Sequence, residues 1–283
     1  MPTSEPKPTS EPHHDDLAYR APPFRGEDAP LVSVITVCWN SAETIRDTLE
    51  SVVEQDHPRI EYIVIDGAST DGTLDILAEY EDHIDVLVSE PDEGLYDAIN
   101  KGIERATGDV VALLNSDDVY ASPSSLRHLI EAKVQAGTKA VFADLVYVKR
   151  NDPSRVVRYY RSKGFTPERL ADGWMPAHPT VIVDREAFER FGGYALDYEI
   201  ASDYDMMIRL FALQRLSYTY LDEVAVRMRD GGLSTANLRS RWVLNTEIVR
   251  ACRRYGLRTS MLRLALKVPS KMLELAVRPS VQG

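Results

Sequence analysis

The chain has 283 residues, of which 44% are hydrophobic, and a formal net charge of -11. This length and apolar content suffice for one large domain or two small ones, and the acidic balance argues against a general nucleic-acid-binding protein. Two cysteines, Cys38 and Cys252, cannot build the disulfide framework of a small secreted protein, so a reducing, cytoplasmic setting is expected.

The N-terminal 30 residues contain seven of the sixteen prolines, interspersed with Ser, Thr, Glu and Asp. This composition predicts a disordered or loosely attached arm. The sequence has no recognisable signal peptide and no apolar run near the roughly 18 residues that span a bilayer, so we expect neither a secretory leader nor a membrane span.

Strand and helix patterns alternate from residue 31 onward. In chain order, the hydrophobic spacing predicts a strand at 31–39, a helix at 41–55, a strand at 60–66, a helix at 71–80, a strand at 85–90, a helix at 94–106, a strand at 110–115, a helix at 122–137 with Pro123 in its first turn, and a strand at 140–148. Strict alternation with apolar strands predicts an α/β, Rossmann-like fold with a mostly parallel sheet flanked by helices.

Acidic and amide side chains follow the predicted strands. Asp66 ends the second strand, Asp92 follows the third, and Asn115, Asp117 and Asp118 follow the fourth. Because ligands bind beyond the carboxyl ends of parallel strands, we expect these groups to share one site. Clustered carboxylates raise each other's pKa, and a divalent cation such as Mg²⁺ or Mn²⁺ relieves that cost. The alternative for the Asn-Ser-Asp-Asp segment is a solvated turn.

Two common phosphate-binding motifs are missing from the sequence. No G-x-G-x-x-G follows the first strand, and no Gly-Lys-Ser/Thr of the P-loop type occurs. A dinucleotide oxidoreductase and a P-loop NTPase are therefore disfavoured.

The C-terminal segment is basic. Residues 239–283 contain ten Lys or Arg against two Glu, which suggests a polyanionic or membrane surface as a partner. Helical spacing places one charged stripe along the last part of this segment, which suits a membrane interface: Arg263, Lys267, Lys271, Glu274 and Arg278. The alternative is a helix that packs on the body of the protein or on a second subunit.

Four segments together resemble family 2 glycosyltransferases of the GT-A fold over about residues 31–235. They are "VSVITVCWNSAETIRDTLESVVEQ", "EYIVIDGASTDGT", "SEPDEGLYDAINKGIERATGDVVALLNSDD" and "IASDYDMMIRL". The wording of the third segment resembles bacterial enzymes that build lipid-linked surface polysaccharides and glycolipids. The resemblance implies an inverting transfer of a sugar from a nucleotide-sugar donor.

The resemblance also implies roles for the donor-side residues. Asp66 matches the position that receives the nucleobase, and Val37 and Trp39 match positions that line it. Asn115 and Asp117 match the two ends of the family's D-x-D motif, so Asp117 becomes the metal ligand, with Asp118 as a second metal contact or a turn residue. Two further residues match or neighbour donor-side positions but suit helix capping or bracing equally well: Asp92 and Asn100.

On the acceptor side, the resemblance makes Asp203 the catalytic base, with a plain helix N-cap as the alternative. Asp205 is expected to stabilise the first turn of the same helix. His178 matches a histidine near the diphosphate or the acceptor, and the alternative is a packed core histidine. Arg227 and Arg229 are expected in a mobile loop, where they either clamp phosphate or are solvated.

Three departures from the family pattern qualify these roles. Asn115 replaces the first Asp of D-x-D, and Gly67 replaces a second Asp that is common after the second strand. Leu238 in "LRSRW" stands where processive synthases carry Gln, which favours addition of a single sugar.

We therefore expect four regions: an arm (1–30), a nucleotide-sugar-binding half (31–148), an acceptor-binding half (149–235) and a basic helical tail (236–283). The predicted enzyme uses Mn²⁺ or Mg²⁺, takes a lipid-linked glycan or glycolipid as acceptor, and lies at the inner face of the plasma membrane. The oligomeric state stays open, a homodimer included. The rival functions are a sugar-1-phosphate nucleotidyltransferase and a non-catalytic scaffold that binds nucleotide-sugars.

Overall fold

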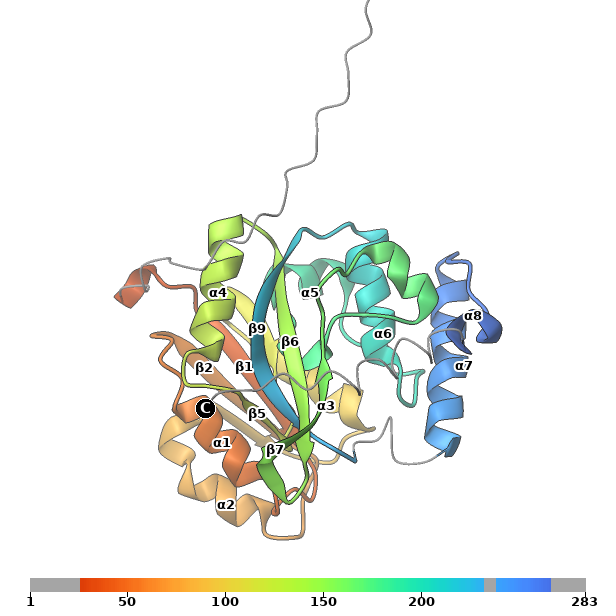
Figure 1. Cartoon of the computed structure of the whole chain (residues 1–283). Helices are drawn as coiled ribbons and strands as arrows, with labels where there is room; N and C mark the ends of the chain where they lie inside the picture. The colour runs from red at the N-terminus through yellow and green to blue at the C-terminus, as the bar shows by residue number, and fades with distance from the viewer. Residues whose placement is uncertain (1–25, 232–237, 266–283) are drawn as a thin grey trace, which may run out of the picture.

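The structure is a computed structural model that describes residues 26–231 and 238–265. Within these residues, nine strands form a single sheet in the order β3-β2-β1-β4-β8-β6-β9-β5, with β7 beside β6 (Figure 1). Strands β3, β2, β1, β4, β6 and β9 run in the same direction, and β5, β7 and β8 run against them. The mostly parallel α/β sheet that the sequence predicts is confirmed.

The first half of the chain follows the predicted alternation. Its elements are β1 (Val32–Cys38), α1 (Ile45–Val53), β2 (Ile60–Asp66), α2 (Thr73–Glu79), η2 (Glu81–His83), β3 (Val86–Ser89), α3 (Leu95–Arg105), β4 (Val110–Leu113), α4 (Ser125–Ala136) and β6 (Ala140–Lys149). One detail is wrong: α4 begins at Ser125, so Pro123 precedes the helix and does not lie in its first turn.

Four further strands, one in the first half of the chain and three in the second, were not revealed by the sequence patterns. These are β5 (Asp118–Tyr120), β7 (Asp152–Tyr160), β8 (Ile182–Asp184) and β9 (Tyr218–Arg229). The remaining helical elements are η1 (Gly26–Asp28), η3 (Pro167–Asp172), η4 (His178–Thr180), α5 (Arg185–Phe191), α6 (Ser202–Met207), the π-helix η5 (Ile208–Leu213), α7 (Leu238–Arg254) and α8 (Met261–Ala265).

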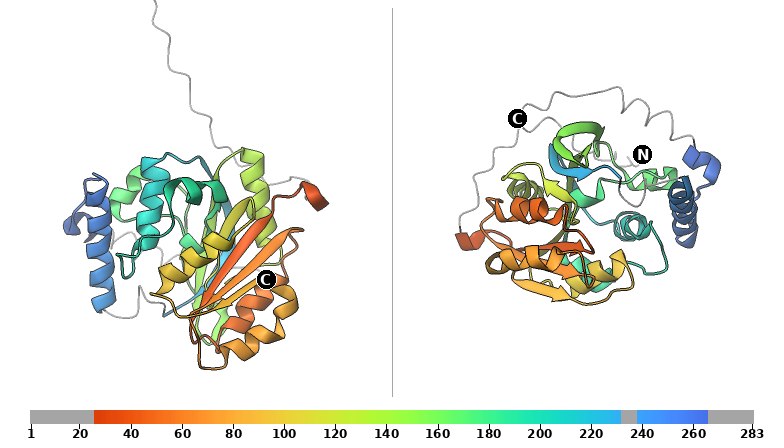
Figure 2. Two further views of the ribbon diagram at one scale, coloured as in Figure 1. Left: turned by 180° about the vertical axis from the view of Figure 1, so that it is seen from behind. Right: turned by 90° about the horizontal axis from the view of Figure 1, so that it is seen from below.

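Side chains alternate between two cores on opposite faces of the sheet. Val32 and Val34 of β1 pack with buried residues of α1, α2 and α4. Ile35 and Val37 pack on the other face with α3, α5, α6 and α7. This period of two is what a strand buried on both faces requires. Figure 2 shows the helices on the two sides of the sheet.

The predicted basic tail begins as part of the body. Helix α7 lies beside α6 and buries Ile248, Val249 and Cys252 against it (Figures 1 and 2). Arg254 of α7 forms an ion pair with Asp197, which precedes α6. This arginine of the predicted basic tail therefore helps to hold α7 against the body of the protein. Most of the charged stripe predicted for a membrane surface, residues 267–278, lies outside the described residues.

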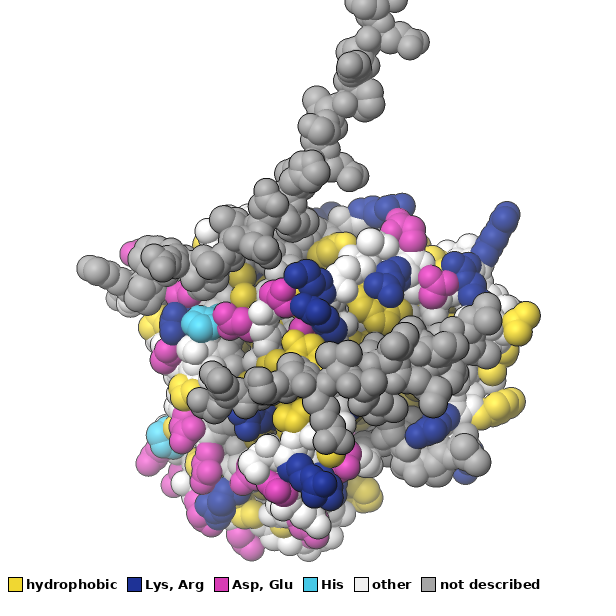
Figure 3. Space-filling view, viewed as in Figure 1, with side chains coloured by type: hydrophobic (Ala, Val, Ile, Leu, Met, Phe, Trp, Pro, Cys, Tyr) yellow, Lys and Arg dark blue, Asp and Glu magenta, His cyan; other side chains and the backbone are white. Residues whose placement is uncertain are grey.

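The predicted arm also lies mostly outside the described residues. Its last part is packed, because Ala29 is buried and its carbonyl accepts a hydrogen bond from Arg59 at 2.9 Å. No helix in the described ranges is long and apolar enough to cross a membrane. On the face drawn in Figure 3, acidic and basic side chains are interspersed, and no large area carries a single sign of charge.

Candidate active site

Hydrogen bonds join the loops that follow β1, β2 and β4 at the carboxyl edge of the sheet. The Asn40 amide donates to Ser69 Oγ at 2.7 Å, and the Ser41 amide donates to Thr73 Oγ1 at 2.8 Å. The hydroxyls of Ser41 and Ser116 lie 2.8 Å apart. Three segments far apart in sequence therefore form one surface, as the sequence argument expected.

Asp66 does not face this surface. Its side chain is 0% exposed, and its carboxylate accepts hydrogen bonds from the Ser69 amide at 3.0 Å, from the Ser69 hydroxyl and from Ser89 Oγ at 2.6 Å. The expectation that Asp66 receives a nucleobase is wrong in this structure, because both oxygens are committed and inaccessible. Asp66 instead fixes the loop that follows β2.

Trp39, Gly67 and Asp92 form the exposed part of this edge. Trp39 is 68% exposed, whereas Val37 is buried in the core and cannot line a base, which corrects its predicted role. A Cβ atom at position 67 would lie 2.5 Å from Asp92 Oδ2 and 3.4 Å from Trp39 Cδ1. Glycine at this position therefore lets the Asp92 carboxylate approach the backbone beside an exposed indole ring.

Asp92 also has the capping role that the sequence left open. Its Oδ1 accepts a hydrogen bond from the Gly94 amide at 2.8 Å, just before α3 begins. Its Oδ2 is the atom that faces Gly67. One carboxylate can thus hold the turn with one oxygen and offer the other to a ligand.

The Asn-Ser-Asp-Asp segment is a turn that leads directly into β5. The Asp118 amide donates to the Asn115 carbonyl at 3.0 Å, and Thr48 Oγ1 donates to the Asp118 carbonyl at 2.8 Å. Asp118 is 0% exposed, so the alternative that it belongs to a solvated turn is wrong. Asp117 is half-buried.

Electrostatics at this turn are unfavourable for two ionised carboxylates. Burial raises the pKa of Asp118 well above its usual range, and the neighbouring charge of Asp117 raises it further. Burial also raises the pKa of Asp117. Asp118 Oδ2 accepts a bond from Asn115 Nδ2 at 3.3 Å, but Oδ1 has no hydrogen-bond partner among the described residues.

These properties fit a divalent cation. An orphaned buried carboxylate oxygen beside a second carboxylate offers hard oxygen ligands of the kind that Mg²⁺ and Mn²⁺ prefer. The described residues contain no group of three or more His, Cys, Asp or Glu that could hold a metal alone. One or two carboxylates completed by substrate phosphates and water is the usual arrangement for Mg²⁺.

A row of side chains leads from Asp118 across the sheet. Asp118 of β5 lies opposite Met228 of β9, Met228 beside Tyr147 of β6, and Tyr147 opposite Arg158 of β7. Such neighbours share one face of a sheet. The Arg158 guanidinium lies 4.0 Å from the centre of the Tyr147 ring and forms no ion pair with the residues that the structure describes. Sequence reasoning did not single out Tyr147 or Arg158.

The same row reaches Asp203. Burial is the main cause of the raised pKa of Tyr147, and both Asp118 and Asp203 raise it further through their charges. Because such charge effects weaken with distance, both the acidic turn and Asp203 lie near enough to Tyr147 to act on its pKa. A shared site for the acidic turn and Asp203 stays a prediction.

Asp203 is the second residue of α6. Ala201 occupies the N-cap position, so the plain N-cap alternative for Asp203 is wrong. Asp203 is half-buried, and its Oδ1 accepts a hydrogen bond from the Tyr204 amide at 2.6 Å. Burial raises the pKa of Asp203 to about 7, and the charge of Glu247 adds to this effect. Asp205 is buried and pairs with Arg209 at 2.8 Å, which stabilises the helix as expected.

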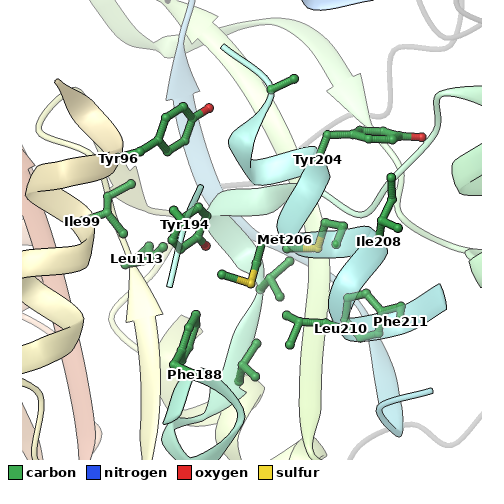
Figure 4. Close-up of a cluster of buried hydrophobic side chains, with 14 of the residues drawn as sticks. Tyr96, Ile99, Leu113, Phe188, Tyr194, Tyr204, Met206, Ile208, Leu210 and Phe211 are labelled. Carbon is green, nitrogen blue, oxygen red and sulfur yellow. The ribbon is translucent and has the colours of Figure 1, made fainter. Parts of the chain in front are cut away.

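Tyrosines surround Asp203. Tyr96 of α3 donates a hydrogen bond to the Ile200 carbonyl, and its ring stacks on Tyr194 at 5.9 Å (Figure 4). Burial is the main cause of the raised pKa of Tyr96 and of Tyr194, and the negative charge of Asp203 is the second cause. The predicted base therefore lies near two buried tyrosine rings.

Asn100 and His178 both contact Tyr194. Asn100 donates to the Tyr194 carbonyl at 2.8 Å and accepts from the Tyr194 amide at 2.7 Å, so its amide braces α3 against this segment and is not available to the donor. His178 Nε2 lies 2.8 Å from the Tyr194 hydroxyl. Burial lowers the pKa of His178 to about 4, so the ring is neutral near pH 7 and can offer only hydrogen bonds to a ligand.

The two arginines expected in a mobile loop belong to strand β9. Arg229 is 3% exposed; it donates to the Asp117 carbonyl at 2.9 Å and pairs with Asp47. Its predicted phosphate contact is wrong, because the guanidinium is buried and holds the acidic turn from behind. Arg227 is half-buried, and its role in ligand binding stays a prediction.

Comparisons with known proteins point to one family. The profile described as Glycosyl transferase family 2 matches residues 33–191. Over 186 residues, 64% of this chain and 69% of the relative, the sequence is 33% identical to an uncharacterized glycosyltransferase of Mycobacterium tuberculosis. Over 94 residues, 32% of this chain and 37% of the relative, it is 50% identical to TuaG of Bacillus subtilis, which is named for teichuronic acid biosynthesis.

Two solved structures share the fold. TarS of S. aureus (residues 1–349, in complex with UDP-GlcNAc) superposes with a TM-score of 0.63 at 20% identity, covering 78% of this chain and 66% of that chain. The mannosyltransferase PcManGT of Pyrobaculum calidifontis, in complex with GDP-Man and Mn²⁺, gives a TM-score of 0.55 at 22% identity, covering 87% of this chain and 81% of that chain.

The raised pKa of Asp203 predicts a pH-dependent cost in stability. The folded state holds a proton on Asp203 up to about pH 7, whereas the unfolded chain releases it near pH 4. Stability is therefore lost as pH rises through this window. Asp203→Asn, which can keep the bond from the Tyr204 amide, should raise the melting temperature relative to the parent protein at pH 8.

The gain in melting temperature of Asp203→Asn over the parent protein should shrink toward pH 4. Thermal unfolding across a series of pH values measures it. Asp82→Asn, at an exposed position in η2, is the matched control and should show no such trend. A gain for Asp203→Asn that is constant over the whole pH range would show that Asp203 is not held in its protonated form.

Proposed function

This chain belongs to glycosyl transferase family 2, and we propose that it moves one sugar from a nucleoside-diphosphate donor to an acceptor hydroxyl with inversion at the anomeric carbon. As a glycosyltransferase, it is neither a nucleotidyltransferase nor a scaffold. One observation supports the finer proposal: burial raises the pKa of Asp203 to about 7, and the charges of Asp203 and Asp118 both act on the pKa of Tyr147.

Asp203 acts in this proposal as the general base. A base is most effective when its pKa lies near the working pH, because it is then both ionised and able to hold the proton. The acceptor hydroxyl gives its proton to the Asp203 carboxylate as its oxygen attacks the anomeric carbon, and the bond from that carbon to the diphosphate breaks. A single displacement of this kind inverts the configuration.

The edge formed by Trp39, Gly67 and Asp92 is the proposed nucleobase subsite. The exposed Trp39 ring offers a stacking surface, and Asp92 Oδ2 offers an acceptor for a ring N–H. Uracil and guanine both carry such N–H groups, and UDP and GDP are the nucleotides in the two similar structures. Asp92 thus takes the role that the sequence assigned to Asp66.

The acidic turn and Arg158 are proposed to receive the diphosphate. Asp117 and Asp118 would hold a divalent cation, with Asn115 fixing Asp118 Oδ2. A bound Mn²⁺ or Mg²⁺ supplies a Lewis acid for the charge that develops on the departing diphosphate. Arg158 lies on the same row across the sheet and adds a positive charge.

The acceptor is proposed to be a lipid-linked glycan or glycolipid of the cell envelope. The similarity to TuaG, named for teichuronic acid biosynthesis, supports a surface-polysaccharide acceptor. The exposed side chains of Arg239, Arg241 and Trp242 on α7 suit contact with an anionic membrane surface. The proposed location is therefore the cytoplasmic face of the plasma membrane.

Removal of the base should stop turnover and leave donor binding intact. Asp203→Asn should lower the rate of nucleoside diphosphate release from UDP-GlcNAc or GDP-mannose by about 100-fold or more. In the parent protein, the rate should fall as pH drops below about 7, because Asp203 becomes protonated. Release is followed in a coupled assay with Mn²⁺ present, and turnover undiminished in Asp203→Asn would remove the assignment.

Loss of either acidic ligand should remove the metal dependence of donor binding. At about 100 times its Kd, a donor adds about 2.7 kcal/mol of stability, which corresponds to a rise in Tm of about 5–10 °C. This rise should need Mn²⁺ in the parent protein and in the control Asp75→Asn, which changes an exposed residue of α2. It should be absent in Asp117→Asn and Asp118→Asn. A rise that is independent of Mn²⁺ in every protein would argue against a cation at this turn.

Gly67→Ala tests the nucleobase subsite. The added methyl group would lie 2.5 Å from Asp92 Oδ2 and should push that flexible carboxylate aside without unfolding the protein. The Kd for UDP or GDP, measured by calorimetry, should rise about tenfold or more, because a hydrogen bond to a charged group contributes about 1.5–3 kcal/mol. Asp75→Ala is the control. An unchanged Kd in Gly67→Ala would show that the nucleobase binds elsewhere.

A further inference from the structure

Glu247 of α7 holds the segment that leads into α6. Its side chain is 12% exposed, although it is a carboxylate. Oε1 accepts a hydrogen bond from the Glu199 amide at 2.8 Å, and Oε2 accepts bonds from the Ile200 amide at 2.8 Å and the Ala201 amide at 2.9 Å. Three consecutive backbone N–H groups on one side chain form a specific anchor, because each would otherwise be left without a partner at the start of a helix.

The anchored segment carries the proposed base. Ala201 is the N-cap residue of α6, and Asp203 follows two residues later. Tyr96 holds the same segment from α3 through the Ile200 carbonyl. The backbone from which Asp203 projects is thus fixed from two sides, by a tyrosine of the donor half and by a carboxylate of the C-terminal helix.

Residues next to Glu247 on α7 make further contacts with α6 and the segment before it. Arg250 donates to the Asp197 carbonyl, and its guanidinium lies 4.2 Å from the centre of the Tyr198 ring. Ile248 and Val249 are buried in the core that includes Met206 and Met207 of α6. Helix α7 is therefore docked by polar and apolar contacts on the same short segment.

We propose that Glu247 is a positioning residue for the transfer reaction, which orients Asp203 by holding residues 199–201 and sets the charge beside it. The proposal rests on the function proposed above for Asp203. It gives α7 a role in catalysis, whereas the sequence suggested a membrane surface for the basic tail, or packing on the body or on a second subunit.

The surroundings of Asp203 leave Glu247 as the negative charge that acts on it. Tyr96 of α3, Tyr194 and Tyr147 of β6 face Asp203 with neutral hydroxyls near pH 7, because burial raises the pKa of each. The Arg158 guanidinium lies over the Tyr147 ring, and that of Arg250 lies 3.9 Å from Glu247 Oε1. Burial raises the pKa of Asp203 and Glu247 raises it further, so loss of the Glu247 charge should lower it.

Two variants of Glu247 separate anchoring from charge. Glu247→Ala removes both acceptor oxygens and with them all three hydrogen bonds. Glu247→Gln keeps one carbonyl oxygen and removes the charge. Thr246→Ala is the matched control on the same helix, because among the described residues the Thr246 hydroxyl bonds to the Val243 carbonyl of its own helix alone.

Hydrogen–deuterium exchange of the free protein tests the anchor. In Glu247→Ala, the amides of residues 199–201 should exchange about tenfold faster or more than in the parent protein, because bonds to a charged acceptor are lost. Thr246→Ala should keep the parent rates. Turnover of UDP-GlcNAc or GDP-mannose with Mn²⁺ should fall on the order of 100-fold in Glu247→Ala, with donor Kd unchanged, because a small misplacement of a catalytic group has a cost of this size.

Carbon-13 NMR of labelled aspartate carboxyl groups tests the charge. The Asp203 signal is assigned by its loss in Asp203→Asn, and its titration midpoint should move to lower pH in Glu247→Gln. The acid limb of the turnover profile should move with it. A purely structural residue would change the melting temperature and leave this midpoint in place.

Failure of this inference differs from failure of the proposed function. If Asp203→Asn keeps full turnover, the base assignment is wrong and the positioning role falls with it. If Asp203→Asn is inactive while folded Glu247→Ala keeps parent exchange rates or parent turnover, only the role of Glu247 is overturned. Should Glu247→Ala fail to fold, an unmoved Asp203 midpoint in Glu247→Gln overturns the proposal by itself.

Discussion

An ionised carboxylate loses its water when it is buried, and the cost must be offset by hydrogen bonds, by an opposite charge or by a proton. Three carboxyl groups at the edge of this sheet meet that constraint in different ways. Asp66 takes hydrogen bonds from Ser69 and Ser89 and becomes part of the scaffold. Asp118 keeps one oxygen without a described partner, which suits a cation. Asp203 keeps a proton up to about pH 7, which suits a general base.

The second half of the sheet places these groups relative to one another. Strand β9 lies between β5 and β6 and carries Arg229, which holds the Asp117 carbonyl from behind. Strands β6 and β7 pair Tyr147 with Arg158, and the charges of both Asp118 and Asp203 raise the pKa of Tyr147. Helix α7 holds the segment before α6 through the hydrogen bond from the Ile200 amide to Glu247. The proposed donor half supplies the cation subsite and the nucleobase subsite. Later segments of the chain hold Asp203, the proposed general base.

The sequence predicted the first half of the fold well because its signals are local. Strands such as β4 are continuous apolar runs, and α3 repeats apolar residues at helical spacing. Strands β5 and β8 have three residues each, and β9 pairs with β6 through a register shift near Asp144, so the patterns of β5, β8 and β9 are too short or irregular to detect. Part of the site could not be predicted for a related reason. Sequence alone does not say whether Asp66 or Asp92 faces outward, and it does not reveal that Glu247 meets backbone groups 46 to 48 residues away.

The stereochemistry of transfer tests the central claim most directly. The account places one carboxylate, Asp203, opposite the departing diphosphate and therefore requires a single displacement. The measurement is proton NMR of the first sugar released, or transferred, from α-linked UDP-GlcNAc in the presence of Mn²⁺. The account predicts that the first product is the β anomer, before mutarotation mixes the forms. A first product with the α configuration would contradict it, because retention requires either a second displacement or attack from the side of the leaving group.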